Sequence, residues 1–182
     1  MTVNIDLHAS SAISAALYGK DMKIESADFF DELRDDAMDQ IGTEADNACT
    51  YYAQCMEIIQ RYERDYGDQA EDFSRGQKFE AADWQKAMVS YAHGIAYCAI
   101  SAAVNESIDE MVEAYENLVS EIPDDVEVPV TLESDCPHGW AAHDRETAEG
   151  VMIWHRLEGE VEARSIRCGD SYLTATWTPA RA

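Results

Sequence analysis

Two runs of carboxylate side chains carry the densest concentration of charge in this sequence. The first run is Asp28, Asp31, Glu32, Asp35, Asp36 and Asp39. The second run is Glu106, Asp109, Glu110, Glu113 and Glu116. Spacings of three and four residues place the members of each run on one side of a helix, opposite that helix's apolar residues. A face of this kind can bind a cationic partner, so these eleven residues are the predicted partner-binding site.

The first run has a charge spacing close to that of a nucleic-acid strand. It spans about 16 Å at 1.5 Å per residue, which is roughly one charge per 3 Å. One DNA strand carries a phosphate every 3.4 Å or so. The run also contains four like-charge pairs at i,i+4, which together destabilise the helix by about 1–2 kcal/mol before salt screening. The match in spacing favours a carboxylate face that imitates a phosphate backbone.

The charge of the whole chain has the same sign and is unevenly distributed. There are 13 Lys and Arg against 37 Asp and Glu, a formal net charge of −24. Residues 1–121 contain 25 acidic and 8 basic residues, whereas the last 33 residues contain four of each. No Lys or Arg occurs from Ala87 to Asp144. Binding to phosphates needs clustered cations, so direct nucleic-acid binding by this chain is not expected.

Other reactive side chains give weaker signals. Cys136, His138 and His143 are residue types that bind zinc, but their spacing fits no common zinc pattern. His93 lies in an uncharged run and is predicted to be a core histidine. The chain contains none of the common hydrolase, metalloprotease or nucleotide-binding motifs. We therefore expect no enzyme and no cofactor, and keep a metal-dependent enzyme using these three residues as the weakest alternative.

The elements that would position the acidic runs are helices. Apolar periodicity predicts helices from Ser26 to about Gln40, over 43–66, over 81–104 and, after a cap or kink at Asn105, on to Ser120. The inner stripe of the third helix is predicted to be Trp84, Met88, Tyr91, Ile95, Cys98 and Ala102. Residues 1–24 leave two alternatives open, because Val3, Ile5 and Leu7 alternate as in a short strand, whereas Ser11 to Tyr18 are compatible with one or two helical turns.

The end of the chain changes to strand-like periodicity. Val126, Val128 and Val130 alternate, and three further strand-like runs cover 151–157, 160–167 and 171–177. These patterns predict an α+β fold, with an N-terminal bundle of about four helices followed by a small C-terminal antiparallel β meander. Residues 1–121 form the mainly helical acidic region. Residues 122–182 form the connector and hairpins, expected to pack on the bundle as one domain.

The uncharged run from Ala87 to Val104 is long enough to span a membrane. It is rich in Ala and contains Ser90, His93 and Gly94, so we predict a buried central helix and no membrane association. Cys49, Cys55 and Cys98 fall on predicted apolar helix faces, which indicates reduced, buried thiols in a cytoplasmic protein. The N-terminus lacks the basic region of a signal peptide.

The leading hypothesis is an acidic inhibitor that occupies the DNA- or RNA-binding groove of a basic protein. In charge and size the chain resembles the acidic proteins that phages and mobile elements direct against host restriction or CRISPR systems, although no motif ties it to a named family. Such a protein would act in the host cytoplasm. The alternative is a protein-interaction or assembly protein whose acids only keep it soluble. Either function is compatible with a homodimer. A third explanation for the charge is adaptation to high salt.

Overall fold

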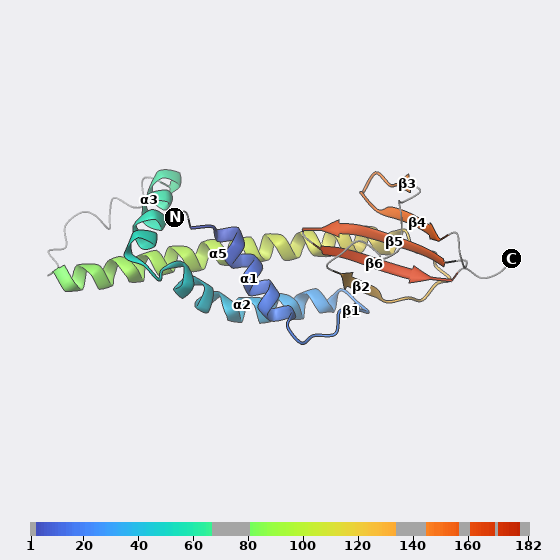
Figure 1. The fold of residues 1–182 in the computed structure, drawn as a ribbon, viewed down its shortest axis with the longest axis horizontal. Helices are drawn as coiled ribbons and strands as arrows, with labels where there is room; N and C mark the ends of the chain where they lie inside the picture. The colour runs from blue at the N-terminus through green and yellow to red at the C-terminus, as the bar shows by residue number, and fades with distance from the viewer. Residues whose placement is uncertain (1–2, 67–80, 134–144, 157–160, 170, 179–182) are drawn as a thin grey trace. The chain divides into compact units, whose positions relative to one another are not determined.

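The described part of the chain consists of helices and an antiparallel sheet. The computed structural model describes residues 3–66, 81–133, 145–156, 161–169 and 171–178. The helices are α1 Ile5–Leu17, α2 Asp28–Ala48, α3 Tyr52–Tyr66 and α5 Ala81–Ser120 (Figure 1). The strands are β1 Lys23–Ile24, β2 Val130–Glu133, β3 Arg145–Glu146, β4 Met152–Arg156, β5 Val161–Cys168 and β6 Ser171–Trp177. The predicted α+β fold, with a helical part followed by an antiparallel sheet, is confirmed.

Contacts along the chain divide it into two compact units. The first unit comprises Met1–Tyr18 and Arg34–Asn105, and the second comprises Gly19–Leu33 and Glu106–Ala182. Helices α2 and α5 each begin in one unit and end in the other. The first unit contains α1 and α3, whereas the second contains the sheet.

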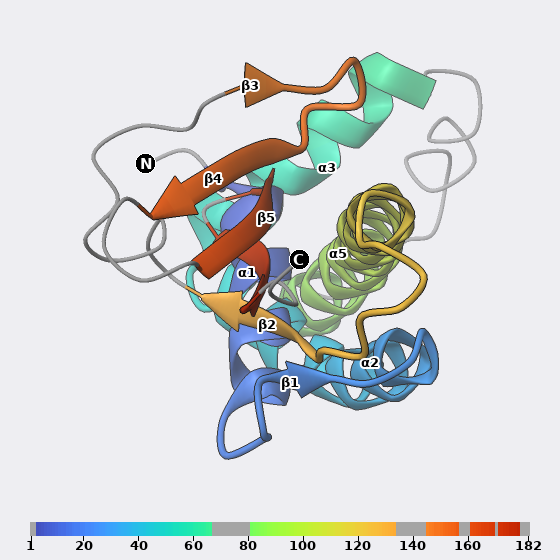
Figure 2. The same cartoon turned by 90° about the vertical axis from the view of Figure 1, so that its right-hand side faces the viewer.

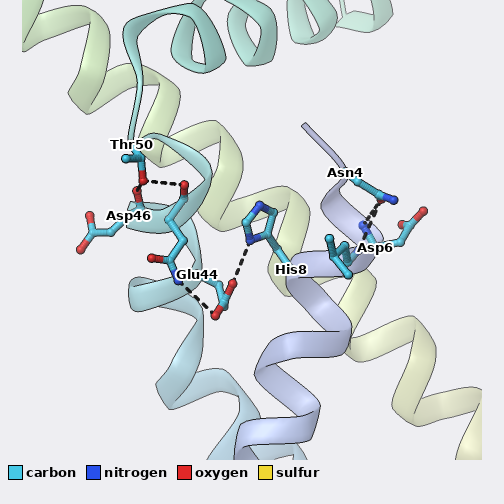
Figure 3. A network of polar contacts seen from close by, with 8 residues as sticks. Asn4, Asp6, His8, Glu44, Asp46 and Thr50 are labelled. Atoms are coloured by element: carbon cyan, nitrogen blue, oxygen red, sulfur yellow. Dashed lines mark hydrogen bonds and ion pairs between the residues drawn. The ribbon is translucent and has the colours of Figure 1, made fainter. Parts of the chain in front are cut away.

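Helix α1 includes Ile5 and Leu7, where alternation favoured a strand, so that interpretation is wrong. The helix continues to Leu17, which confirms the helical alternative over most of Ser11 to Tyr18. Asn4 is the N-cap, and its Oδ1 accepts the backbone N–H groups of Asp6 at 3.1 Å and Leu7 at 3.3 Å (Figure 3). This cap satisfies backbone donors that a helix start otherwise leaves without partners. Three small residues, Ala9, Ala12 and Ala16, form the buried side. The cap and the alanine stripe therefore outweigh a three-residue alternation.

Helix α2 continues to Ala48, past Gln40 where the predicted helix ended and through Gly42, so the predicted start of a second helix at residue 43 is wrong. The fully buried stripe of Phe30, Leu33, Ala37 and Ile41 continues one and two turns further, through Ala45 and Ala48. Burial of these alanines offsets the roughly 1 kcal/mol by which a helical glycine is less favourable than alanine. The helix ends before Thr50, whose hydroxyl donates to the Asn47 carbonyl at 2.8 Å.

Helix α5 is one continuous helix of 40 residues, so the predicted cap or kink at Asn105 is wrong. The Asn105 side chain donates from Nδ2 to the Ser101 carbonyl at 2.9 Å, and its Oδ1 accepts from Arg34 Nη1 at 2.9 Å. The Asn105 amide group thus forms hydrogen bonds without interrupting the backbone hydrogen bonds of the helix. Because Arg34 belongs to α2, this pair also joins α2 to α5 within the first unit.

The buried side of α5 differs from the predicted stripe. Residues spaced by four are buried: Met88, Ala92, Ala96, Ile100, Val104 and Ile108. Of the predicted inner residues, Cys98 and Ala102 are exposed and Tyr91 and Ile95 are half-buried. The prediction followed the larger side chains, but alanines allow closer approach of a neighbouring helix and so occupy the contact. Cys98 is therefore an exposed thiol, contrary to expectation, whereas Cys49 and Cys55 are buried as predicted.

Helix α5 is also the one described element that is long and apolar enough to cross a membrane, over Lys86–Ser120. That criterion uses length and composition alone, and core helices of soluble proteins meet it as well. In this helix, 28% of the most apolar stretch is buried. The prediction of a buried central helix is therefore wrong for one side of α5, which exposes uncharged residues, and right for the buried stripe.

The described strands form one antiparallel sheet in the order β1-β2-β6-β5-β4-β3 (Figure 1). Figure 2 shows the same sheet turned by 90°, with β1 and β3 at its two ends. The predicted meander of three closing strands corresponds to β4, β5 and β6. Gly169, with φ +58°, takes up the left-handed conformation between β5 and β6, which glycine adopts without strain. The strand predicted over 126–130 is wrong for residues 126–129, because β2 begins at Val130. The two short strands at the ends of the sheet, β1 and β3, were not predicted.

Candidate partner-binding acidic faces

The first acidic run lies along the solvent side of α2. All six residues are exposed, and we call them the α2 acid face: Asp28, Asp31, Glu32, Asp35, Asp36 and Asp39. The opposite side of the same helix is the stripe that begins with Phe30 and Leu33, both fully buried. Burial of that stripe fixes the rotation of α2 about its axis, so the carboxylates are held outward by the core.

The second acidic run lies on the solvent side of α5. Its members are all exposed and form the α5 acid face: Glu106, Asp109, Glu110, Glu113 and Glu116. Ile108 and Leu118, on the other side, are fully buried. Because the chain has no Lys or Arg between Lys86 and Arg145, no cation of α5 itself interrupts this face.

Within the second unit the two faces belong to neighbouring helices. The Phe30 ring of α2 lies 5.4 Å from the Tyr115 ring of α5, centroid to centroid, in an edge-on arrangement. Phe30 also contacts the Phe29 ring at 5.5 Å. This aromatic cluster places the first turn of α2 beside the C-terminal part of α5. Asp28, Asp31 and Glu32 therefore share a unit with the whole α5 acid face.

The one cation within the α2 run turns toward α5. Arg34 is half-buried, and its guanidinium donates to Asn105, as described above. Its side chain thus helps to join two helices, and its charge lies on the inner side of α2. The solvent side of α2 from Asp28 to Asp39 keeps a strongly negative character.

Removal of the like-charge pairs on α2 is expected to stabilise the protein. Glu32 and Asp35 are members of all four i,i+4 acidic pairs, so Glu32→Gln/Asp35→Asn removes every one. We expect the free energy of unfolding to rise by about 1–2 kcal/mol at low salt, because each pair costs about 0.2–0.5 kcal/mol. Urea denaturation followed by circular dichroism measures this.

The salt dependence provides the control for that variant. In 1 M NaCl, where the Debye length is about 3 Å, the gain should shrink to a small fraction. An unchanged or lowered stability at low salt would show that the repulsion is not present on this face.

The predicted metal ligands Cys136, His138 and His143 lie outside the described residues. In the part of the chain that the structure describes, no group of three His, Cys, Asp or Glu side chains could hold a metal ion. The metal hypothesis thus gains no support from the described geometry, and the acidic faces remain the candidate site.

Two histidine–carboxylate pairs in the first unit were not predicted. His8 Nδ1 lies 2.8 Å from Glu44 Oε2 and joins α1 to α2 (Figure 3). His93 Nε2 lies 3.2 Å from Asp46 Oδ1 and joins α5 to α2. The His93 side chain is 35% exposed, so the predicted core histidine is instead a partly exposed one. The partners are far apart in sequence, which is why spacing along the chain gave no signal for either pair.

The thiols of Cys49, which is buried, and of Cys168, which is half-buried, are chemically protected. Burial, followed by the neighbouring Cys55 and Asp46, raises the pKa of Cys49 from 9.0 to about 12. Cys55 Sγ donates to the Cys49 carbonyl at 3.5 Å. Burial and then Glu110 raise the pKa of Cys168 to about 11. Since a thiolate is the reactive form, these groups should react slowly.

At pH 8 we expect iodoacetamide to modify the exposed Cys98 well before Cys49. A pKa rise from 9.0 to about 12 lowers the thiolate fraction of Cys49 roughly 1000-fold. The stabilisation linked to this raised pKa is present below pH 9 and is lost as the pH rises toward 12. Peptide mapping by mass spectrometry measures both labelling rates. Rates within tenfold of each other would contradict the burial of Cys49.

Comparisons with protein-family models, with curated proteins and with solved structures found no match for this chain.

Proposed function

We propose that this protein is an acidic inhibitor that imitates a nucleic-acid strand and occupies the DNA- or RNA-binding groove of a basic protein. It acts by binding and needs neither catalysis nor a cofactor. Its site of action is the cytoplasm, which is the host cytoplasm if a phage or mobile element carries the gene. Restriction and CRISPR complexes are the kind of target that this chemistry suits.

The observation that carries the proposal is the exposure of all eleven carboxylates of the two acid faces. Each face is on a helix whose opposite side is buried, so its charges are positioned before a partner arrives. A preorganised negative surface accelerates encounter with a basic groove and then excludes nucleic acid sterically. A merely solubilising charge would need no such order.

A competition assay tests the proposal. Labelled duplex DNA is bound in turn to a restriction endonuclease, a CRISPR effector and a histone octamer, and the full-length protein is titrated into each complex. Fluorescence anisotropy should show displacement of DNA from at least one target, weakening about tenfold or more between 50 mM and 300 mM NaCl. If the protein displaces DNA from none of the three targets, the result counts against mimicry.

An assembly protein is the second candidate, favoured by the uncharged exposed side of α5. Val89 and Tyr97 are 40% and 39% exposed on that helix. An apolar pocket of about 510 Å³, lined in part by Tyr62 and Tyr91, lies in the first unit, which also contains Val89 and Tyr97. A partner or second copy bound there would associate almost independently of salt, so the same titration separates the two functions.

A further inference from the structure

The second unit contains a groove that the acid faces do not include. It lies between β1, the C-terminal part of α5 and the residues that connect α5 to β2, and we call it the connector groove. Its volume is about 650 Å³, within the range of ligand-binding pockets. Ile24 and Val130 are buried in its wall, and Tyr115 lines it from α5.

Part of the apolar lining of the groove faces solvent. Val119 is 41% exposed, and Val126 and Val128 are half-buried. Residues 126–129 alternate apolar side chains without being part of a strand. These side chains offer apolar surface that a partner's side chain could remove from water.

The rim of the groove is mostly negative. Glu25, Asp124 and Glu127 line it and are exposed, against one lining cation, Lys23, among the described residues. A free anion or a nucleic acid would be repelled at this rim. An apolar side chain flanked by Lys or Arg would satisfy both the apolar wall and the acidic rim.

The neighbouring strand suits an extended occupant. β1 is at one end of the described sheet and pairs with β2 through Lys23↔Thr131 and Ile24↔Val130. β1 is thus an edge strand, and Lys23, Ile24 and Glu25 all line the groove. Extended peptides recognise such edges by main-chain hydrogen bonds, with side chains placed in adjacent pockets.

We infer that the connector groove binds an extended segment of a basic protein, with an apolar side chain between Val119 and Val128 and flanking Lys or Arg side chains against Glu25, Asp124 and Glu127. This inference takes the basic partner from the proposed function and adds a specific anchor to it. Charge on the acid faces would speed the encounter, whereas the groove would select a sequence.

Three labelled ten-residue peptides test the groove in the full-length protein. The first is GKKVLFVKKG, the second replaces its apolar centre to give GKKSGSSKKG, and the third replaces its charges to give GEEVLFVEEG. Anisotropy in 150 mM NaCl should show the first binding at least about tenfold more tightly than either other peptide. Equal affinity of the first two peptides would overturn the inference.

Paired variants locate the binding. Val119→Lys and Asp124→Asn/Glu127→Gln should each weaken the first peptide about fivefold or more. The matched controls are Val89→Lys, equally exposed on α5 but outside the groove, and Asp6→Asn/Glu149→Gln, which removes two exposed carboxylates outside both the groove and the acid faces. Neither control should change affinity more than twofold. The conservative amide pair keeps the test valid if Val119→Lys disturbs folding.

The two proposals fail in different ways. Peptide binding that is lost only in Asp35→Asn/Asp39→Asn, on the α2 acid face, overturns the groove and leaves mimicry intact. Peptide binding that responds to the groove variants, by a protein that displaces DNA from none of the basic targets, supports the groove and overturns mimicry.

Discussion

The variant Asp31→Asn/Glu32→Gln/Asp35→Asn/Asp39→Asn is expected to inhibit DNA binding by the target about 30-fold less well than the parent protein. Each exposed carboxylate that meets a cation contributes about 0.5 kcal/mol, within the range for surface ion pairs. Four such losses total about 2 kcal/mol, which corresponds to roughly 30-fold in affinity. The amides keep the size of the side chains and leave the buried side of α2 unchanged, so the loss should come from charge.

A matched variant separates the face from the net charge. Asp6→Asn/Asp21→Asn/Asp125→Asn/Glu149→Gln removes the same number of exposed carboxylates from outside the two acid faces and the groove lining. It should retain inhibition within about threefold at 150 mM NaCl. If both variants lose inhibition equally, only the total charge matters and ordered mimicry is wrong. If neither loses inhibition, the α2 acid face is not the contact.

Stability and binding are expected to respond in opposite directions on α2. Glu32→Gln/Asp35→Asn should make the protein more stable, while removing charges that the proposed function uses. With its four repulsive pairs, α2 is less stable than a helix that has the same buried residues and fewer charges on its exposed side. Such a compromise is expected where function, and not folding, determines the surface.

The acid faces could be predicted from the sequence because one periodicity governs both sides of an amphipathic helix. Once Phe30, Leu33 and Ala37 are placed inward, the 3.6-residue repeat places Asp28, Asp31 and Asp35 outward. The same logic applied to Ile108 and its neighbours on α5. The closing strands were predictable for a similar reason, because their alternation is long and their turns contain glycine.

Stripes of small residues, and features formed by residues distant in sequence, could not be predicted in this way. The buried stripe of α5 uses Ala92 and Ala96, which a rule weighted toward large side chains passes over. The two-residue strand β1 exists because β2 lies beside it, and its own sequence is too short to carry a strand signal. The connector groove depends on β1, α5 and residues 122–130 together. No pattern within one segment of the sequence predicts that these three segments lie together.

Replacement of Arg164 by alanine is expected to destabilise the sheet strongly. Arg164 is only 8% exposed on β5, and its guanidinium carbon lies 4.9 Å from the centroid of the Trp177 ring. Nη1 donates to the Ala163 carbonyl at 3.1 Å, and Nη2 lies 3.3 Å from Glu162 Oε2. Arg164 pairs with Ala175 and Glu162 with Trp177, so the cation, carboxylate and ring share one face of the sheet.

The alanine variant loses three contributions at once. The cation–π contact is worth about 1 kcal/mol, and hydrogen bonds to a charged group are worth about 1.5–3 kcal/mol. Truncation also leaves a cavity beside Trp177. Because Glu162 retains access to water, we expect a net loss of about 2–4 kcal/mol and a fall in Tm of about 5–15 °C. Urea denaturation followed by tryptophan fluorescence measures the first, and differential scanning calorimetry measures the second.

Two companion variants show whether charge or packing dominates at Arg164. Arg164→Met fills most of the volume and removes the buried Nε, which has no hydrogen-bond partner among the described residues. Its loss should be about 1 kcal/mol or less, since an apolar replacement for a buried charge is often nearly neutral. Arg167→Ala, at an exposed position near the end of the same strand, should cost less than about 1 kcal/mol. A methionine variant as unstable as the alanine variant would show that the charge itself, through Trp177 and Glu162, holds this end of the sheet together.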